Sequence, residues 1–390
     1  MKFCAKLLGI LFVAGIASLS NWSSAAPAAS PPGIAPPSSG QSATTRPSIA
    51  DIQQSIDRGV KFLVGFQNPD GSWGTGTETR GSEIMSMVPG SHDAFRIGTS
   101  ALCVMALREA GEKTAHDKGL EYLLTCTDAK RDDGTLLYNT WAHIYMVHAL
   151  AIEMRYNKDP RIPKVLKRNL KEMVDYATYM GGWAYYDFNY GTVAPGGGPT
   201  SFGTAAGLVA LYEAKKSGID VPDKLIKQAI HRLEEMRLPN GAYLYGTDYK
   251  YYPHSARVPA NLPRGAAGRV QPANFSLWLW DSKIASGPNI RDGLEMFVKE
   301  HPFLENGRKH LWPHEALYQI SGYYYYFDHY YAARLLEALA PAERAKYKQF
   351  LIDTVRPHQE EDGSWWDYPM WDYHKPYGTA FAVMTLLRCK

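Results

Sequence analysis

A turn made of a glycine and an aromatic residue recurs along this chain and constrains its fold more than any other feature. The clearest copies are Asp70-Gly71-Ser72-Trp73 and Asp362-Gly363-Ser364-Trp365. From Gly71 to Gly363 the chain takes five steps of about 58 residues, which is long for one helix or strand and right for a helix pair with its loops. The repeat therefore predicts six similar helix pairs. The other four turns lie at Asp133-Gly134, at Gly182-Trp183, at Asn240-Gly241-Ala242-Tyr243 and between Asn306 and Trp312.

The two helices of each pair differ in their hydrophobic pattern. Between Ile162 and Ala177, apolar residues recur at helical spacing among lysines and arginines, which indicates a helix with one wet face. The segment Phe202–Leu211 carries no charge and must be enclosed on every side. Similar apolar stretches run over Ile97–Leu107 and Tyr377–Met384. Amphipathic outer helices and apolar inner helices are therefore expected to alternate along the chain.

The end of the repeat favours a closed ring over an open solenoid. An open solenoid would need polar terminal caps, whereas the last copy ends in the apolar segment Phe381–Leu387. We therefore expect an all-α (α/α)6 toroid over residues 49–390, with six outer helices around six inner ones. The loops that enter the inner helices would gather at one end of the barrel and build any site there.

The first residues are predicted to be a targeting segment. Lys2 and Lys6 precede an apolar run from Leu7 to Leu19, and the small residues around Ala25 offer a cleavage site. The run is too short for a membrane span, so residues 1–25 are expected to be a Sec-type export signal that leads to the periplasm or the outside of the cell. Residues 26–48 are rich in Pro, Ser and Ala and are expected to form a flexible linker.

The charge balance and the aromatic content narrow the classes of ligand that the protein could bind. The chain has 42 Lys and Arg against 39 Asp and Glu, so it offers no electrostatic reason to expect nucleic acid or an anionic membrane. Aromatic residues make up 13% of the chain, which suits either a sugar or isoprenoid site or an aromatic-rich core. We expect a monomer that binds a hydrophobic or glycan small molecule.

A glutamine four residues before the glycine of the first and last turns gives a pattern that resembles a known family. The patterns Gln67-x3-Gly71-x-Trp73 and Gln359-x3-Gly363-x-Trp365 resemble the repeat of terpenoid cyclases of the squalene-hopene type and of protein prenyltransferase β subunits. The resemblance covers about residues 50 to 390 and implies a toroid with a central cavity at the inner-helix starts, in a divergent secreted bacterial-type member.

The catalytic motifs of those families are missing. The sequence has no Asp-x-Asp-Asp acid motif of the cyclases. Pro272 and Asn274 occupy the places of the Asp and Cys that hold zinc in prenyltransferases, although His329 resembles the zinc histidine of that family. We therefore assign no metal site, and any cofactor is unknown.

Candidate site residues are those expected near the inner-helix starts. Asp328 with His329, and Asp372 with His374, place an acid beside an imidazole, which suits proton transfer. Each also has a simpler explanation as a helix cap or a satisfied core histidine. Two arginines come from a long basic insertion that is either a lid binding an anion or a plain surface loop. The candidate ligand-binding residues are Trp141, His143, Trp278, Tyr326, Tyr377, Arg257 and Arg264.

Three functions remain open from the sequence. The chain binds or transforms an isoprenoid-like ligand, or it is a secreted (α/α)6 polysaccharide lyase or glycosidase, or it is a non-catalytic toroid that binds a peptide or protein. An apolar aromatic pocket would favour the first. An open groove with Arg257 or Arg264 opposite Tyr and His would favour the second, because a lyase needs a base and a cation for the uronate carboxylate.

Overall fold

The computed structural model describes residues 47–77, 91–126, 140–184, 198–247, 258–310 and 322–390. The chain separates into two units, Met1–Arg46 and Pro47–Lys390, and every element named below belongs to the second. The predicted signal and most of the predicted linker lie outside the described residues. Within the described ranges, none of the helices combines the length and the apolar character that crossing a membrane requires.

Outer and inner helices alternate along the described part of the chain, and together they form the expected (α/α)6 toroid. The outer helices are α1 (Ile49–Gly65), α3 (Thr114–Thr125), α5 (Arg161–Asp175), α7 (Asp223–Glu235), α10 (Gly287–Gly307) and α12 (Pro341–Val355). The inner helices are α2 (Ser91–Ala110), α4 (Thr140–Glu153), α6 (Ser201–Lys216), α9 (Val270–Leu279), α11 (Tyr325–Leu335) and α13 (His374–Cys389). Short elements complete the set: α8 (Pro263–Ala266) and the 3-10 turns Pro259–Asn261, Ala267–Arg269, Gly322–Tyr324, Leu336–Ala338 and Arg356–His358.

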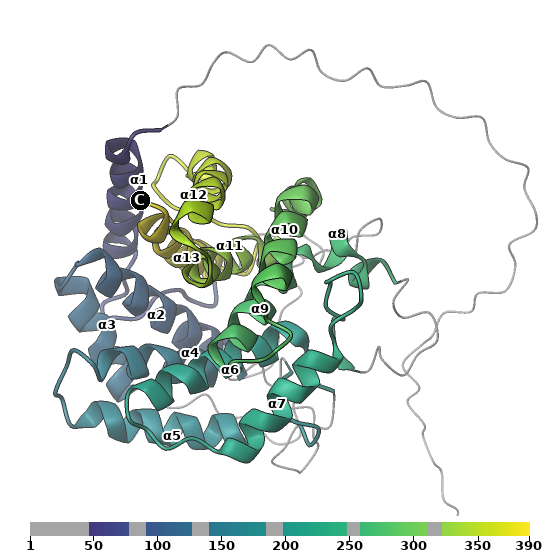
Figure 1. The fold of residues 1–390 in the computed structure, drawn as a ribbon. Helices are drawn as coiled ribbons and strands as arrows, with labels where there is room; N and C mark the ends of the chain where they lie inside the picture. The colour runs from purple at the N-terminus through teal and green to yellow at the C-terminus, as the bar shows by residue number, and fades with distance from the viewer. Residues whose placement is uncertain (1–46, 78–90, 127–139, 185–197, 248–257, 311–321) are drawn as a thin grey trace, which may run out of the picture. The chain divides into compact units, whose positions relative to one another are not determined.

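The inner helices form a closed ring. Each packs against the next in the order α2, α4, α6, α9, α11 and α13, and α13 packs back against α2. The first outer helix, α1, lies against α13, so the first and last copies of the repeat meet (Figure 1). The uncapped apolar C-terminal helix is covered in this way, as the closed-ring prediction required.

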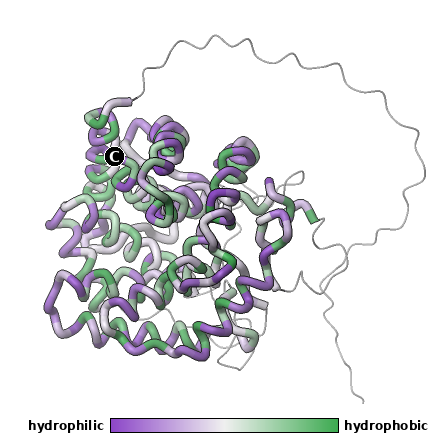
Figure 2. Tube along the Cα trace, in the orientation of Figure 1, coloured by the Kyte–Doolittle hydropathy of each residue, from purple (hydrophilic) through white to green (hydrophobic). Residues whose placement is uncertain are grey.

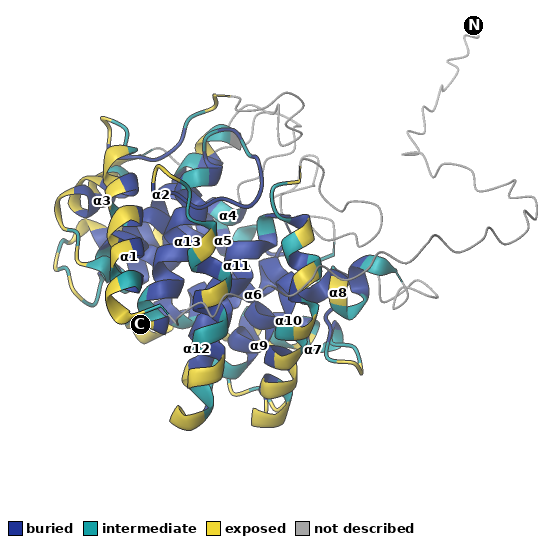
Figure 3. Cartoon of the chain, turned by 90° about the horizontal axis from the view of Figure 1, so that it is seen from above, coloured by how far each residue is buried: buried dark blue, intermediate teal, exposed yellow. Residues whose placement is uncertain are grey.

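Burial follows the hydrophobic pattern. In α6 every residue from Ser201 to Leu211 is buried, whereas α5 buries one stripe that includes Ile162, Val165 and Leu166. Figure 2 shows hydrophilic and hydrophobic residues alternating along outer helices such as α5 and α7. In Figure 3 the inner helices are almost wholly buried, and the exposed residues lie mainly on the outer ones. The apolar inner helices thus form one core that the outer helices shield from water.

Tryptophans of the repeat turns tie the outer helix of a copy to its inner helix. Trp73, Trp183 and Trp365 are fully buried. Each indole N–H donates to a carbonyl ten residues earlier, near the end of the outer helix: Leu63 (2.7 Å), Met173 (2.7 Å) and Val355 (2.9 Å). Each backbone N–H donates to a hydroxyl of the inner helix: Ser100 (2.9 Å), Thr204 (3.2 Å) and Thr379 (2.9 Å). The same geometry in three copies explains why the turn recurs.

Glutamines of the first and last turns join neighbouring copies. The Gln67 amide donates to the carbonyls of Gly71 and of Ala115 in α3, both at 2.9 Å. The Gln359 amide donates at 2.9 Å to Gly363 and to Ser55, which lies in α1. The second of these bonds therefore holds the ring closed. Gly363 has a φ of +90°, and a Cβ there would lie 2.6 Å from a backbone oxygen of Arg58, so only glycine fits.

Ion pairs occupy the C-terminal ends of the inner helices. Glu213 in the last turns of α6 binds Arg155 at 2.7 Å and Arg334 of α11 at 3.1 Å. Arg388 of α13 binds Glu109 of α2. Because these side chains gather at one end of the barrel, space for a ligand is left at the other, where the inner helices begin.

Candidate aromatic pocket

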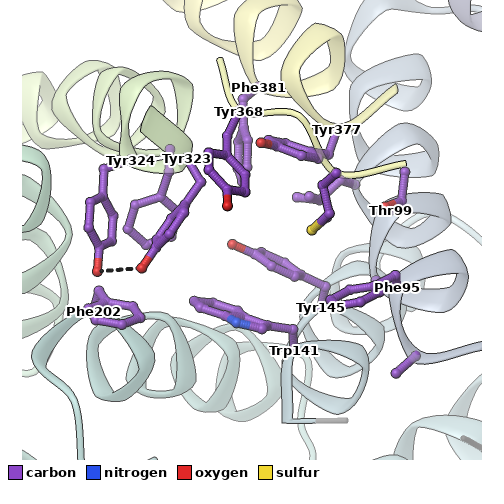
Figure 4. A pocket seen from close by; sticks show the side chains of 15 residues that line it. Phe95, Thr99, Trp141, Tyr145, Phe202, Tyr323, Tyr324, Tyr368, Tyr377 and Phe381 are labelled. Atoms are coloured by element: carbon purple, nitrogen blue, oxygen red, sulfur yellow. Dashed lines mark hydrogen bonds between the residues drawn. The ribbon is translucent and has the colours of Figure 1, made fainter. Parts of the chain in front are cut away.

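A cavity of about 130 Å³ lies at the start of the inner helices (Figure 4). Five of these helices, or the turns leading into them, supply its walls, and α9 supplies none of the lining residues. The lining residues are Ala94, Phe95, Gly98, Thr99, Leu102, Trp141, Tyr145, Phe202, Tyr323, Tyr324, Phe327, Tyr368, Met370, Tyr377 and Phe381. The volume far exceeds the roughly 10–15 Å³ that one ordered water needs.

The lining is almost entirely aromatic and apolar. Ten of its fifteen residues are Phe, Tyr or Trp, and none of the fifteen carries a charge. Its polar atoms are tyrosine hydroxyls, the Trp141 indole nitrogen and the Thr99 hydroxyl. Figure 4 shows the hydroxyls of Tyr145 and Tyr368 pointing into the open space. Such a surface suits a ligand with a large apolar body and few polar groups.

The aromatic walls support one another. Trp141 stacks on Tyr145, with ring centroids 5.7 Å apart, and on Phe202 at 6.1 Å. Phe327 meets Trp141 edge-on at 6.1 Å, and Phe381 meets Tyr145 in the same way at 6.1 Å. Each of these rings is therefore held in place by its neighbours.

A buried carboxyl group lies directly behind this wall. The hydroxyl of Tyr377, a lining residue, donates to Oδ1 of Asp367, which is fully buried. Oδ2 of Asp367 accepts the backbone N–H of Tyr326 at 3.1 Å. Burial raises the pKa of Asp367 to about 7, and its hydrogen bonds oppose this rise. The same burial, with the adjacent carboxyl, raises the pKa of Tyr377 well above its usual value.

The sequence prediction did not include Asp367. The signal was present, because the residue follows the repeat tryptophan Trp365 by two positions and stands between the aromatic residues Trp366 and Tyr368. A lone acid between two large aromatic side chains beside a repeat turn has few ways to reach water. Of the predicted ligand-binding residues, Trp141 and Tyr377 line the pocket. Tyr326 does not line the pocket, but its backbone N–H bonds Asp367, which in turn bonds the lining residue Tyr377.

Asp328 and His329 are both buried but face different neighbours. Oδ1 of Asp328 accepts the backbone N–H of Gln271 at the start of α9, at 3.3 Å, and burial raises the pKa of this carboxyl. His329 packs toward the outer helices, with its Nε2 3.2 Å from Nε2 of His301 in α10 and 3.1 Å from Oγ1 of Thr354 in α12. Neither residue is among those that line the pocket.

Asp372 and His374 also bind different groups. The carboxyl of Asp372 accepts hydrogen bonds from the backbone N–H and the hydroxyl of Thr75, the latter at 2.8 Å. The Nδ1 of His374 is bonded to the carbonyl of Trp371, and its ring meets Trp366 edge-on at 5.1 Å. Neither of the two is a lining residue of the pocket, although the loop that carries Asp372 and leads into α13 at His374 contributes Tyr368 and Met370 to it.

Three more predicted residues, His143, Trp278 and Arg264, lie outside the lining. His143 faces α5, where its Nδ1 is 3.0 Å from Oδ1 of Asn169. Trp278 lies in the last turn of α9, away from the inner-helix starts. Arg264 is exposed on α8, with its guanidinium 4.8 Å from the ring centre of Phe303. Arg257 is outside the described residues.

Among the described residues, no three His, Cys, Asp or Glu side chains come together in a group that could hold a metal ion. Cys103, Cys126 and Cys389 are free thiols, and burial raises the pKa of Cys103 well above its usual value.

Comparison with known proteins gives a fold and no family. No protein-family model matches the sequence, and no curated protein matches it. Among solved structures, cellobiose 2-epimerase from Spirochaeta thermophila matches with 12% identity and a TM-score of 0.57, over 87% of this chain and 96% of that one. An inactive variant of an α-1,6-mannanase from Salegentibacter sp., in complex with α-1,6-mannotetrose, matches with 11% identity and a TM-score of 0.56, over 87% of this chain and 98% of that one. A type II terpene cyclase from Scytonema matches with 14% identity and a TM-score of 0.50, over the same shares of the two chains.

These neighbours share the (α/α)6 toroid and act on different substrates. At such low identity they establish the architecture alone, because unrelated chemistries are built on one toroid. The terpene cyclase among them agrees with the resemblance seen in the repeat turns, and it does not place this chain in that family. The function therefore has to be inferred from the pocket.

Proposed function

We propose that the aromatic pocket at the inner-helix starts binds a small isoprenoid-like hydrophobic ligand. The observation that carries the proposal is the composition of the lining, with ten aromatic residues and no charged one among fifteen. Removing apolar surface from water contributes about 25 cal/mol per Å², so a hydrocarbon ligand would gain affinity from nearly every wall. With residues 1–25 as an export signal, the protein would carry out this binding in the periplasm or outside the cell.

A glycan is the second candidate, and one observation favours it. Trp141 presents a flat indole beside several tyrosine hydroxyls, and such surfaces can stack on a sugar ring and bond its hydroxyls. Two toroid neighbours also act on sugars, by their names. Against this, a glycosidase commonly uses a pair of carboxyl groups at the scissile bond, and the fifteen lining residues include none. A lyase needs a cation for the uronate carboxylate, and Arg264 lies on Phe303 instead.

Native mass spectrometry of the protein purified from its own host tests the proposal. We expect a bound lipid that survives gentle desolvation and is released by organic solvent. A matched pair of variants connects that lipid to the pocket. Ala94→Trp fills part of the cavity from α2, because Ala94 is a lining residue, and should abolish the lipid adduct. Lys164→Trp adds the same side chain to the exposed face of α5 and should leave it unchanged. Circular dichroism checks that both variants fold.

An adduct that is present in all three proteins would place the lipid elsewhere on the molecule. A lipid-free protein that depolymerises an acidic or neutral glycan would overturn the isoprenoid proposal and favour the second candidate.

A further inference from the structure

We propose that the ligand of this pocket carries an organic ammonium group, held against the aromatic rings with Asp367 as its buried counter-charge. The inference rests on the proposed function, because it concerns the same pocket, and it adds a charge to the apolar ligand.

The first support is the electrostatic character of the walls. Aromatic faces carry partial negative charge and attract a cation within about 6 Å of the ring centre. Trp141, Tyr145, Phe202 and Phe327 form one continuous aromatic surface. None of the fifteen lining residues is Lys or Arg, and a guanidinium does lie over one lining ring, that of Arg269 at 5.8 Å from the ring centre of Tyr324. A ligand cation in the cavity would therefore meet the parts of these rings that line it.

The second support is the orientation of the Tyr377 hydroxyl. Its proton is donated to Oδ1 of Asp367, so its oxygen remains as a hydrogen-bond acceptor. An ammonium N–H can donate to that oxygen, and the negative charge of Asp367 then lies one hydroxyl group behind the contact. A neutral hydrocarbon would make no use of an acid at this position, whereas a cation would stabilise the ionised form of this buried carboxyl.

The side chain of Asp367 is held by uncharged hydrogen-bond donors. Its carboxyl binds the hydroxyl of Tyr377 from α13 and the backbone N–H of Tyr326 from α11. The cation that lowers the pKa of this carboxyl is Arg308, just beyond α10, whose guanidinium also bonds Glu305 at 2.7 Å. The titratable and charged groups that act on Asp367 from its own loop and the packed elements are Tyr368, Tyr377, Tyr326 and Arg308.

The proposal makes binding depend on pH. Because the pKa of Asp367 is raised to about 7, the carboxyl is mostly protonated at pH 6 and mostly ionised at pH 8. A cation binds the ionised form better. Its affinity should therefore rise about tenfold between these values and level off above them.

Two probes of the same shape separate charge from hydrophobicity. Cyclohexylmethylamine is an ammonium ion at both pH values, and cyclohexylmethanol is its neutral counterpart. Titration calorimetry at pH 6 and pH 8 should show the amine gaining about tenfold in affinity and the alcohol gaining nothing. Asp367→Asn should remove the gain for the amine and leave the alcohol unchanged. Asp372→Asn is the matched control, because that carboxyl binds Thr75 outside the pocket lining, and it should keep the gain.

Tyr377→Phe provides a second variant if Asp367→Asn does not fold, and it should weaken the amine more than the alcohol. Equal affinities of the two probes at both pH values would overturn the cation inference and leave the hydrophobic pocket intact. Failure of both probes to bind a folded protein from which the lipid has been removed would also overturn the inference. Absence of a lipid adduct from the natural protein in native mass spectrometry would instead contradict the proposed function.

Discussion

The hydroxyl of Tyr377 donates a hydrogen bond to the buried carboxyl of Asp367, which places an acid directly behind the wall of an aromatic pocket. Tyr377 belongs to the first turn of α13, and Asp367 to the loop that precedes this helix. The pair therefore connects the last repeat turn, whose role is structural, to the pocket surface that a ligand would contact.

Asp367 should make the fold less stable as the solution becomes more alkaline. Its pKa rises from 3.8 to about 7 in the folded protein, so folding favours the protonated acid. That contribution is fully present below about pH 4 and is lost as the pH rises through 7. Asp367→Asn has no such dependence. The melting temperature of the variant relative to the natural protein should therefore increase between pH 5 and pH 8.5, in differential scanning fluorimetry. A constant difference across this range would contradict the raised pKa.

The pair of histidines His301 and His329 should make the fold less stable as the solution becomes more acidic. Burial lowers the pKa of His301 to about 4, and it lowers that of His329 as well, so the fold keeps both neutral. The stability they contribute is present above about pH 6.5 and is lost as the pH falls toward 4. His301→Gln should flatten this loss in thermal melts between pH 7 and pH 4.5. His231→Gln, on the exposed face of α7, should not, and equal slopes for the two variants would argue against the prediction.

Closure of the ring should depend on Gln359. Its amide bonds the carbonyls of Ser55 in α1 and of Gly363, so Gln359→Ala removes a hydrogen bond between the two ends of the domain and a second one within the turn. The expected loss is about 1–3 kcal/mol in urea unfolding. Gln67→Ala should lose a similar amount, because it makes the same bonds in the first copy. Gln349→Ala is the control, since that amide bonds only Asp353 within α12. Indistinguishable midpoints for all three variants would refute this role.

The pocket wall should determine affinity for an apolar ligand. Trp141→Ala removes a ring that packs on Tyr145 and Phe202, and it should weaken binding of farnesol by about tenfold or more. Trp280→Ala is the comparison. Trp280 directly follows α9, its indole N–H bonds the carbonyl of Leu208 in α6, and it is not a lining residue of the pocket. Competition against a fluorescent fatty probe measures both. Equal losses in the two variants would indicate a general effect on the fold.

The fold could be predicted from the sequence because its determinants are local and repeated. Uninterrupted apolar runs such as Phe202–Leu211 must be enclosed on every side, and the spacing of the turns indicates the number of helix pairs. The turns themselves recur because Trp73, Trp183 and Trp365 make the same two bonds in three copies. These are short-range relationships that spacing along the chain reveals.

The site was harder to predict because it depends on which way each helix faces. Asp328 and His329 are adjacent in sequence, but successive residues of a helix point in directions about 100° apart, so one meets α9 and the other meets α10 and α12. Trp278 was placed at an inner-helix start, whereas α9 begins at Val270 and puts it two turns further along. The position of Asp367 beside the repeat turn suggests burial, but it does not indicate the bonds to Tyr326 and Tyr377 that place this carboxyl behind the pocket wall.

One measurement tests the central claim most directly, namely whether Trp141 contacts an isoprenoid. The protein is labelled with 5-fluorotryptophan, and the fluorine resonance of Trp141 is assigned by its absence in Trp141→Phe. On titration with farnesol this resonance should shift or broaden saturably, while the resonances of the buried turn residues Trp73 and Trp365 should stay in place. Mannotetraose should leave the Trp141 resonance unchanged. A Trp141 resonance that responds to the oligosaccharide and not to farnesol would contradict the account.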